Sequence, residues 1–150
     1  MTTESGVLSD TQYSFRTRFA EGIGTNPDEL IAASLSGCFS MALSNELGLA
    51  GFPPQQIETT ATATLEDLAA GWTLTHVQLD VRANVPNISQ ARFMDAALGA
   101  KTGCPVAHLL NTNISMIASL THDLKGVLKR IETDAPKVTI AKLFLSGEVQ

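Results

Sequence analysis

The residues of this 150-residue chain that are best suited to chemistry are its two cysteines, Cys38 and Cys104. Cys38 lies within SLSGCFSMALS, residues 34–44, a stretch with no charged residue, and Cys104 precedes a proline in KTGCPVAHLL. A thiolate is a nucleophile and a metal ligand, whereas a buried neutral thiol behaves as a small apolar side chain. Each cysteine therefore has either a reactive role or a packing role.

Taken alone, Cys38 fits a packing role better. Free cysteine is among the most buried residue types, and Cys38 lies about 12 positions into a predicted helix, beyond the first turn where the helix dipole acts. A reactive Cys38 therefore needs a nearby cation that stabilises its thiolate. Cys104 differs, because we predict it at the N-cap of a short helix, where free backbone N–H groups would lower the pKa of its thiol. Chance placement explains that position equally well.

Other cysteine chemistries have less support. Zinc needs three or four ligands, and the candidates Cys38, Cys104, His76, His108 and His122 are scattered, with no close ligand pair. A cysteine hydrolase that uses Cys38 and His108 is compatible with the spacing, but nothing local favours it. A disulfide between the cysteines would close a loop of about 66 residues, and in a reducing compartment only a transient one is expected.

Composition and charge limit the classes of function. Hydrophobic residues make up 44% and charged residues 17%, which predicts one globular domain over residues 1–150. A net charge of −5 with no basic run disfavours nucleic acid and anionic membrane surfaces as partners. The longest uncharged stretch, residues 30–45, is too short to span a bilayer as a helix. MTTESGVLSD lacks the features of a signal peptide, so we expect a cytoplasmic protein with free thiols.

The residues before the first helix alternate in type. Tyr13, Phe15, Thr17 and Phe19 are separated by Ser14, Arg16 and Arg18. This period of two predicts a half-buried strand in which the two arginines share the face opposite the aromatic rings.

The remaining pattern predicts helices and strands in a fixed order. Asn26 as N-cap, Pro27 at the first helical position and a following acidic pair begin a helix that runs to about Ala50. Later elements are a hairpin of residues 57–66 and 72–85, helices over 89–101 and 104–110, a strand over 113–120, then a helix after 121 and a strand over 137–145. This order predicts an α+β fold in which a sheet packs on buried helices.

Three segments, TESGVLSDTQYSFRTRFAEG, GTNPDELIAASLSGCFSMALS and KTGCPVAHLL, together resemble the OsmC branch of the OsmC/Ohr family of thiol peroxidases. The resemblance covers about residues 3–120. It implies an intertwined homodimer with antiparallel sheets wrapped around long central helices and with active sites at the subunit interface. It also implies reduction of organic hydroperoxides as an antioxidant stress response, with lipoyl-type dithiols as reductants and no metal, flavin or haem cofactor.

The resemblance assigns roles to four residues. Cys38 corresponds to the peroxide-attacking cysteine, Cys104 to the resolving cysteine and Arg18 to the arginine that stabilises the thiolate. The family has a glutamate ten residues before the attacking cysteine, where this chain has Asp28. Helix geometry favours Asp28, about 80° from Cys38 around the axis, over Glu29 at about 180°. Aspartate is one methylene shorter, and it is also an ordinary first-turn partner of the helix dipole, so both roles stay open.

Both ends of the chain depart from the family. Members usually have a further strand and turn before TESGVL and end near Leu120, whereas this chain carries a tail over residues 121–150. The apolar residues Val138 and Ile140 predict that the tail strand is paired along the sheet edge left by the missing first strand, either in its own subunit or in the dimer partner. The alternative is a flexible extension.

A second function is compatible with the same fold, namely a non-catalytic dimer that holds an acyl chain or a similar ligand in an interface cavity. The joint presence of Cys38, Cys104 and Arg18 favours catalysis, because a binding cavity needs none of them.

Overall fold

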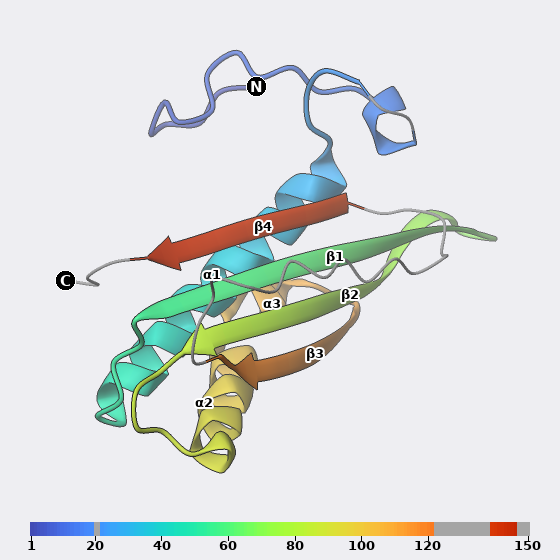
Figure 1. The fold of residues 1–150 in the computed structure, drawn as a ribbon. Coiled ribbons are helices and arrows are strands. Elements are labelled where there is room, and N and C mark those ends of the chain that lie inside the picture. The colour runs from blue at the N-terminus through green and yellow to red at the C-terminus, as the bar shows by residue number, and fades with distance from the viewer. Residues whose placement is uncertain (20–21, 122–138, 147–150) are drawn as a thin grey trace.

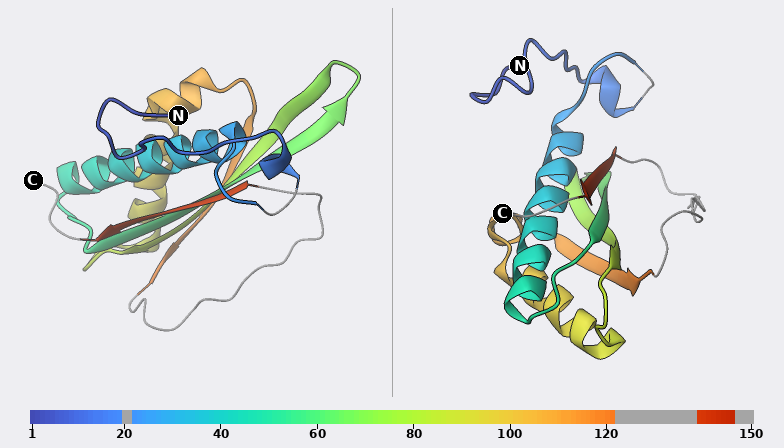
Figure 2. Two further views of the ribbon diagram at one scale, coloured as in Figure 1. Left: turned by 90° about the horizontal axis from the view of Figure 1, so that it is seen from above. Right: turned by 60° about the vertical axis from the view of Figure 1, so that its left-hand side comes forward.

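The structure, a computed structural model, describes residues 1–19, 22–121 and, as backbone, 139–146 (Figure 1). Its elements are η1 (Arg16–Arg18), α1 (Pro27–Leu49), β1 (Gln56–Leu68), β2 (Gly71–Asn84), α2 (Gln90–Gly103), α3 (Pro105–Leu109), β3 (Asn113–Leu120) and β4 (Thr139–Ser146). The four strands form one sheet in the order β3-β2-β1-β4, and the α-helices lie on one of its faces (Figure 2). This arrangement confirms the predicted α+β fold.

The sheet is mixed rather than wholly antiparallel. β1 pairs with β2 and with β4 in antiparallel fashion, but β2 and β3 are parallel. Parallel neighbours need a crossover connection, and the chain supplies it with α2 and α3 between the two strands. This crossover brings the start of α3, and with it Cys104, to the helical face of the sheet.

α1 begins and ends where its capping residues predict. Asn26 has an extended backbone, and its side-chain oxygen accepts a hydrogen bond from the Glu29 backbone N–H at 2.9 Å. Pro27 occupies the first helical position, where a missing N–H costs nothing. After Leu49 the chain leaves the helix through Gly51, which has a positive φ of 82°.

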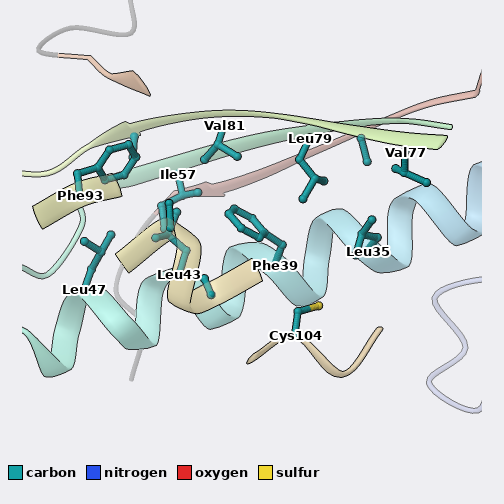
Figure 3. Close-up of a cluster of buried hydrophobic side chains, with 14 of the residues drawn as sticks. Leu35, Phe39, Leu43, Leu47, Ile57, Val77, Leu79, Val81, Phe93 and Cys104 are labelled. Carbon is teal, nitrogen blue, oxygen red and sulfur yellow. The ribbon is translucent and has the colours of Figure 1, made fainter. Parts of the chain in front are cut away.

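The core lies between α1 and the inner face of the hairpin (Figure 3). Leu35, Phe39 and Leu43 of α1 are fully buried and belong to one cluster with alternate residues of the strands. In that layer a buried hydroxyl pair, Ser40 and Thr59, is satisfied by a hydrogen bond of 2.7 Å. The middle of α1 is therefore fixed against the sheet.

Within the described part of the chain, α1 is also long and apolar enough to cross a bilayer, judged by length and composition alone. The sequence predicted a segment too short to cross a bilayer because only the uncharged residues 30–45 were counted, whereas the whole helix has 23 residues. Helices at the core of globular domains pass the same test, and α1 has that character because its leucine and phenylalanine face packs on the sheet.

The strand predicted around residues 13–19 is wrong. The chain forms a single 3₁₀ turn there, and only an isolated bridge joins Tyr13 to Thr25. The hydroxyl of Ser14 accepts a hydrogen bond from the Thr17 backbone N–H at 3.2 Å, which favours a local turn over a ladder. Arg16 and Arg18 consequently do not share a face, because residues two positions apart in a 3₁₀ helix are rotated by about 240°, which leaves them about 120° apart around the axis.

The tail strand is present and paired. β4 lies beside β1 in the same chain, with register from Gln56 opposite Ser146 to Ala63 opposite Thr139. This confirms a paired strand at the sheet edge and contradicts a flexible extension for residues 139–146. The helix predicted after residue 121 lies outside the described residues.

Candidate active site

The two cysteines meet although 66 positions separate them. α1 places Cys38 at the border between its buried and exposed sides, while the junction of α2 and α3 places Cys104 in the core (Figure 3). The Cys104 thiol donates to the Cys38 sulfur over 2.7 Å, and both cysteines are free thiols. A small shift would allow these sulfur atoms to form a disulfide, and Cys38 is the one that solvent reaches.

The environment of Cys104 corrects the expectation of a lowered pKa. Burial, together with the hydrogen bond and charge interaction with Cys38, raises the pKa of the Cys104 thiol above its ordinary value of 9.0. The backbone amides of Ala107 and Val106 at the start of α3 act in the opposite direction, as predicted for an N-cap, but they do not outweigh desolvation. Cys104 is therefore a neutral thiol at neutral pH.

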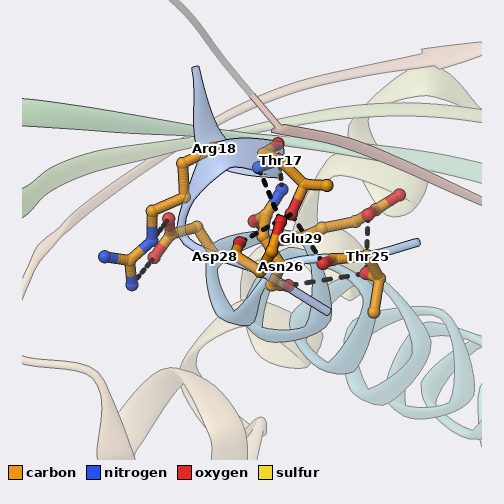
Figure 4. A network of polar contacts seen from close by, with 7 residues as sticks. Thr17, Arg18, Thr25, Asn26, Asp28 and Glu29 are labelled. Carbon is orange, nitrogen blue, oxygen red and sulfur yellow. Dashed lines mark hydrogen bonds and ion pairs between the residues drawn. The ribbon is translucent and has the colours of Figure 1, made fainter. Parts of the chain in front are cut away.

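Arg18 and Asp28 form an ion pair at the N-terminal end of α1 (Figure 4). The Nε of Arg18 lies 2.8 Å from Oδ2 of Asp28, and Nη2 donates to Oδ1 at 3.3 Å. The buried Nε–H of Arg18 does not point at Oδ2, so Nε makes no hydrogen bond despite this short distance. Charge attraction and the Nη2 hydrogen bond therefore hold the two side chains together. The side chain of Asp28 is one methylene shorter than the family's glutamate, yet it is long enough to reach Arg18.

Neighbouring side chains separate the roles of Asp28 and Glu29. The carboxylate of Glu29 accepts a hydrogen bond from the Thr25 hydroxyl at 2.6 Å, away from Arg18. Arg18 also places its guanidinium carbon 5.8 Å from the centroid of the Phe15 ring, a cation–π distance. Of the two acidic residues in the first turn, Asp28 is therefore the partner of Arg18, which is the pairing that the family resemblance implied.

The structure joins the four predicted residues as two separate pairs. Asp28 and Cys38 are ten residues apart on α1, a rise of about 15 Å along the helix axis. Among the described residues no contact links Arg18 to either thiol. One chain therefore presents an ion pair at the start of α1 and a thiol pair near its middle.

The alternative chemistries find no matching geometry in the described residues. They contain no group of three or more His, Cys, Asp or Glu side chains that could hold a metal ion. Nε2 of His108 lies 2.5 Å from the carbonyl oxygen of Thr102, and Nε2 of His76 lies 2.6 Å from the Ser115 hydroxyl. His108 is thus directed at a backbone carbonyl rather than at Cys38, and His122 lies outside the described residues.

A sequence model of the family described as OsmC-like protein matches residues 20–119, two thirds of the chain. The chain belongs to the OsmC family. It is 46% identical over 116 residues to proteins named Peroxiredoxin OsmC from Escherichia coli strain K12 and Shigella flexneri. These matches cover 77% of this chain and 81% of each relative.

Solved structures of the OsmC and Ohr type share the fold. The organic hydroperoxide resistance protein OhrB of Bacillus subtilis aligns with a TM-score of 0.58 at 21% identity, covering 80% of this chain and 87% of that one. An OsmC protein of Legionella pneumophila gives 0.61 at 21% identity, covering 80% and 86%. The OsmC-like protein of Mycoplasma pneumoniae gives 0.61 at 17% identity, covering 81% and 94%.

Proposed function

We propose that this protein is a thiol peroxidase that reduces organic hydroperoxides to alcohols, with Cys38 as the attacking and Cys104 as the resolving cysteine. The observation that carries the proposal is the 2.7 Å contact between two free thiols from distant segments. The peroxiredoxin name of relatives at 46% identity supports the same chemistry.

The proposed cycle uses the different environments of the two thiols. The Cys38 thiolate attacks one peroxide oxygen, the O–O bond breaks, and the alkoxide leaves as an alcohol after taking a proton. The Cys38 sulfenic acid then condenses with the Cys104 thiol, forming a disulfide and releasing one water. A dithiol reductant reopens the disulfide by exchange and is itself oxidised to a disulfide. The buried neutral thiol of Cys104 suits the second step, because it does not compete with Cys38 for peroxide.

Arg18 is the cation that stabilises the Cys38 thiolate in this proposal, and Asp28 holds Arg18. Because their ion pair lies about 15 Å along α1 from Cys38 of the same chain, a second chain has to complete the site. We therefore propose a homodimer in which Arg18 of the partner subunit approaches Cys38.

The surface of α1 supports this dimer. α1 carries no charged residue over residues 30–45, yet the sheet, α2 and α3 leave part of this stretch uncovered. Ser34 and Met41 are exposed, Met41 to 68%, on a part of the helix with no charged residue. A second copy of the chain offers a matching uncharged face.

The reductant and the compartment complete the proposal. Thiol exchange needs a reducing environment that supplies dithiols, so we place the protein in the cytoplasm with a lipoyl-type dithiol as its reductant. A non-catalytic acyl-chain binding protein is the alternative, but its function would need neither the thiol pair nor the Arg18–Asp28 ion pair.

A peroxide consumption assay tests the proposal. Purified protein is supplied with cumene hydroperoxide and a small dithiol, and the wild type is compared with Cys38→Ser. Serine supplies no comparable anionic nucleophile at neutral pH, so the variant should retain less than about a tenth of the wild-type rate. Circular dichroism confirms that the variant is folded. A residual rate above about a tenth of the wild-type rate would overturn the assignment of Cys38 as the attacking cysteine.

A further inference from the structure

We infer that Asn26 is a positioning residue that holds Arg18 in place for the reaction, in addition to capping α1. The inference rests on the proposed function, in which Arg18 stabilises the Cys38 thiolate. It concerns how one side chain fixes both members of the Arg18–Asp28 ion pair.

Among its contacts, the Asn26 side chain makes a pair of hydrogen bonds in which it accepts one and donates the other. Its Oδ1 accepts from the Glu29 backbone N–H at 2.9 Å, and its Nδ2 donates to the carbonyl oxygen of Thr17 at 3.0 Å (Figure 4). One partner can only donate and the other can only accept, so the orientation of the amide is fixed. Asn26 is 6% exposed, which shields both bonds from water.

The two bonds locate the two charged residues together. Thr17 directly precedes Arg18 in the 3₁₀ turn, so holding the Thr17 carbonyl fixes the backbone from which the guanidinium extends. Asp28 lies two positions after Asn26 in the first turn of α1, so the cap fixes the backbone that carries the carboxylate. Asn26 therefore sets the distance between the turn and the helix.

Few other described contacts join the segment that carries Arg18 to the start of α1. The Arg18–Asp28 ion pair is one, and the Thr25 backbone N–H, which donates to the Gln12 carbonyl oxygen at 2.9 Å, is another. The Thr17 hydroxyl lies 2.9 Å from the Thr25 carbonyl oxygen and 2.7 Å from that of Ser14, and its single proton serves one of them at a time. The rings of Phe15 and Phe19 are 64% and 51% exposed, and the ring contact that Phe19 makes beyond this segment is with Trp72 of β2, at 4.9 Å between centroids, rather than with α1. The Asn26 amide is thus a principal link between Arg18 and α1.

Two substitutions remove the hydrogen bond to the Thr17 carbonyl oxygen and keep the hydrogen bond that caps α1. Asn26→Ser and Asn26→Asp keep an oxygen that caps the helix about as well as asparagine, but neither offers the donor that reaches Thr17. We expect the second-order rate of peroxide attack on Cys38 to fall about three- to tenfold, the effect of one lost hydrogen bond. Ser89→Ala is the matched control, because it removes the side-chain cap of α2, a bond of 3.4 Å to the Arg92 N–H, without touching the turn.

A double-mutant cycle with Arg18→Ala distinguishes positioning from a general loss of stability. Rates are measured by stopped flow with reduced protein and cumene hydroperoxide. If Asn26 acts through Arg18, Asn26→Ser slows the wild type but not the Arg18→Ala variant. An equal slowing in both backgrounds, or none in the wild type, overturns the inference and leaves the proposed function intact. A wild type that does not react with hydroperoxide, or an Arg18→Ala variant as fast as the wild type, overturns the premise and the inference together.

Discussion

The thiol of Cys104 lies 2.7 Å from that of Cys38, and only Cys38 is open to solvent. The contact depends on the crossover from β2 to β3, which returns the chain to α1 at the start of α3. The pKa of the buried Cys104 thiol is raised, so the pair contains one accessible sulfur and one protected, protonated sulfur. This asymmetry is what an attacking and a resolving cysteine require.

Arg18→Ala should slow peroxide attack on Cys38, whereas Arg16→Ala should not. A charge-assisted interaction is worth about 1.5–3 kcal/mol, which corresponds to a rate lower by about one to two orders of magnitude. Arg16 is the matched control because it is exposed, lies in the same turn and does not face Asp28. Stopped-flow rates with cumene hydroperoxide measure the effect. Similar rates for the two variants would remove the special role of Arg18.

Asp28→Asn should reproduce part of the Arg18→Ala defect, because a neutral amide no longer balances the guanidinium within 2.8 Å. Glu29→Gln is the control, because it removes a charge from the same helical turn. The Glu29 side chain contacts Thr25 rather than Arg18, so this substitution should leave the rate unchanged. Asp28→Glu keeps the charge and should retain most activity. A defect in Glu29→Gln as large as that in Asp28→Asn would show that first-turn charge, and not the ion pair, is what matters.

The raised pKa of Cys104 predicts how stability depends on pH. The folded protein holds the Cys104 proton more tightly than the unfolded chain, so this contribution is complete below about pH 9 and is lost as pH rises through the folded pKa. The free energy of unfolding of the reduced protein should therefore fall above about pH 9, by at most about 1.4 kcal/mol per pH unit from this group. Urea denaturation of the wild type and Cys104→Ser at rising pH isolates the effect. Parallel pH profiles for the two proteins would contradict it.

Truncation after Thr121 should destabilise the protein, because it removes β4 and leaves the outer edge of β1, from Gln56 to Ala63, without a partner strand in this chain. We expect a melting temperature lower by at least about 5 °C and a tendency to aggregate, measured by differential scanning fluorimetry and light scattering. Truncation after Ser146 keeps the whole of β4 and is the control. A soluble protein with unchanged melting temperature and activity after the longer truncation would mean that β4 has no structural role.

Features set by neighbouring residues could be predicted from the sequence. The cap at Asn26 with Pro27 after it fixes the start of α1, and the alternation on both sides of residues 67–71 fixes the hairpin. The short helix after Cys104 is equally local, since Pro105 provides its first residue. These signals act within a few residues, so no knowledge of the fold is needed.

Other features could not be predicted in this way, either because a competing local bond decides them or because they depend on tertiary contacts. The alternation around Phe15 suggests a strand, but local bonds from Ser14 favour a turn. The Cys104 pKa depends on burial in the core, which outweighs the visible N-cap. The second bond of Asn26, to Thr17, spans nine residues through a loop and has no sequence signal beyond the asparagine itself.

The most direct test of the central claim is to treat the fully reduced protein with one equivalent of cumene hydroperoxide, count the free thiols and map the products by mass spectrometry. The proposed cycle predicts one alcohol per chain, loss of both thiols and a disulfide-linked peptide pair that contains Cys38 and Cys104. In the Cys104→Ser control, one equivalent should convert Cys38 to its sulfenic acid, and a second equivalent should oxidise that to sulfinic acid, because no resolving thiol is available. A wild type that keeps both thiols free, or that oxidises Cys104 while Cys38 stays reduced, would contradict the assignment.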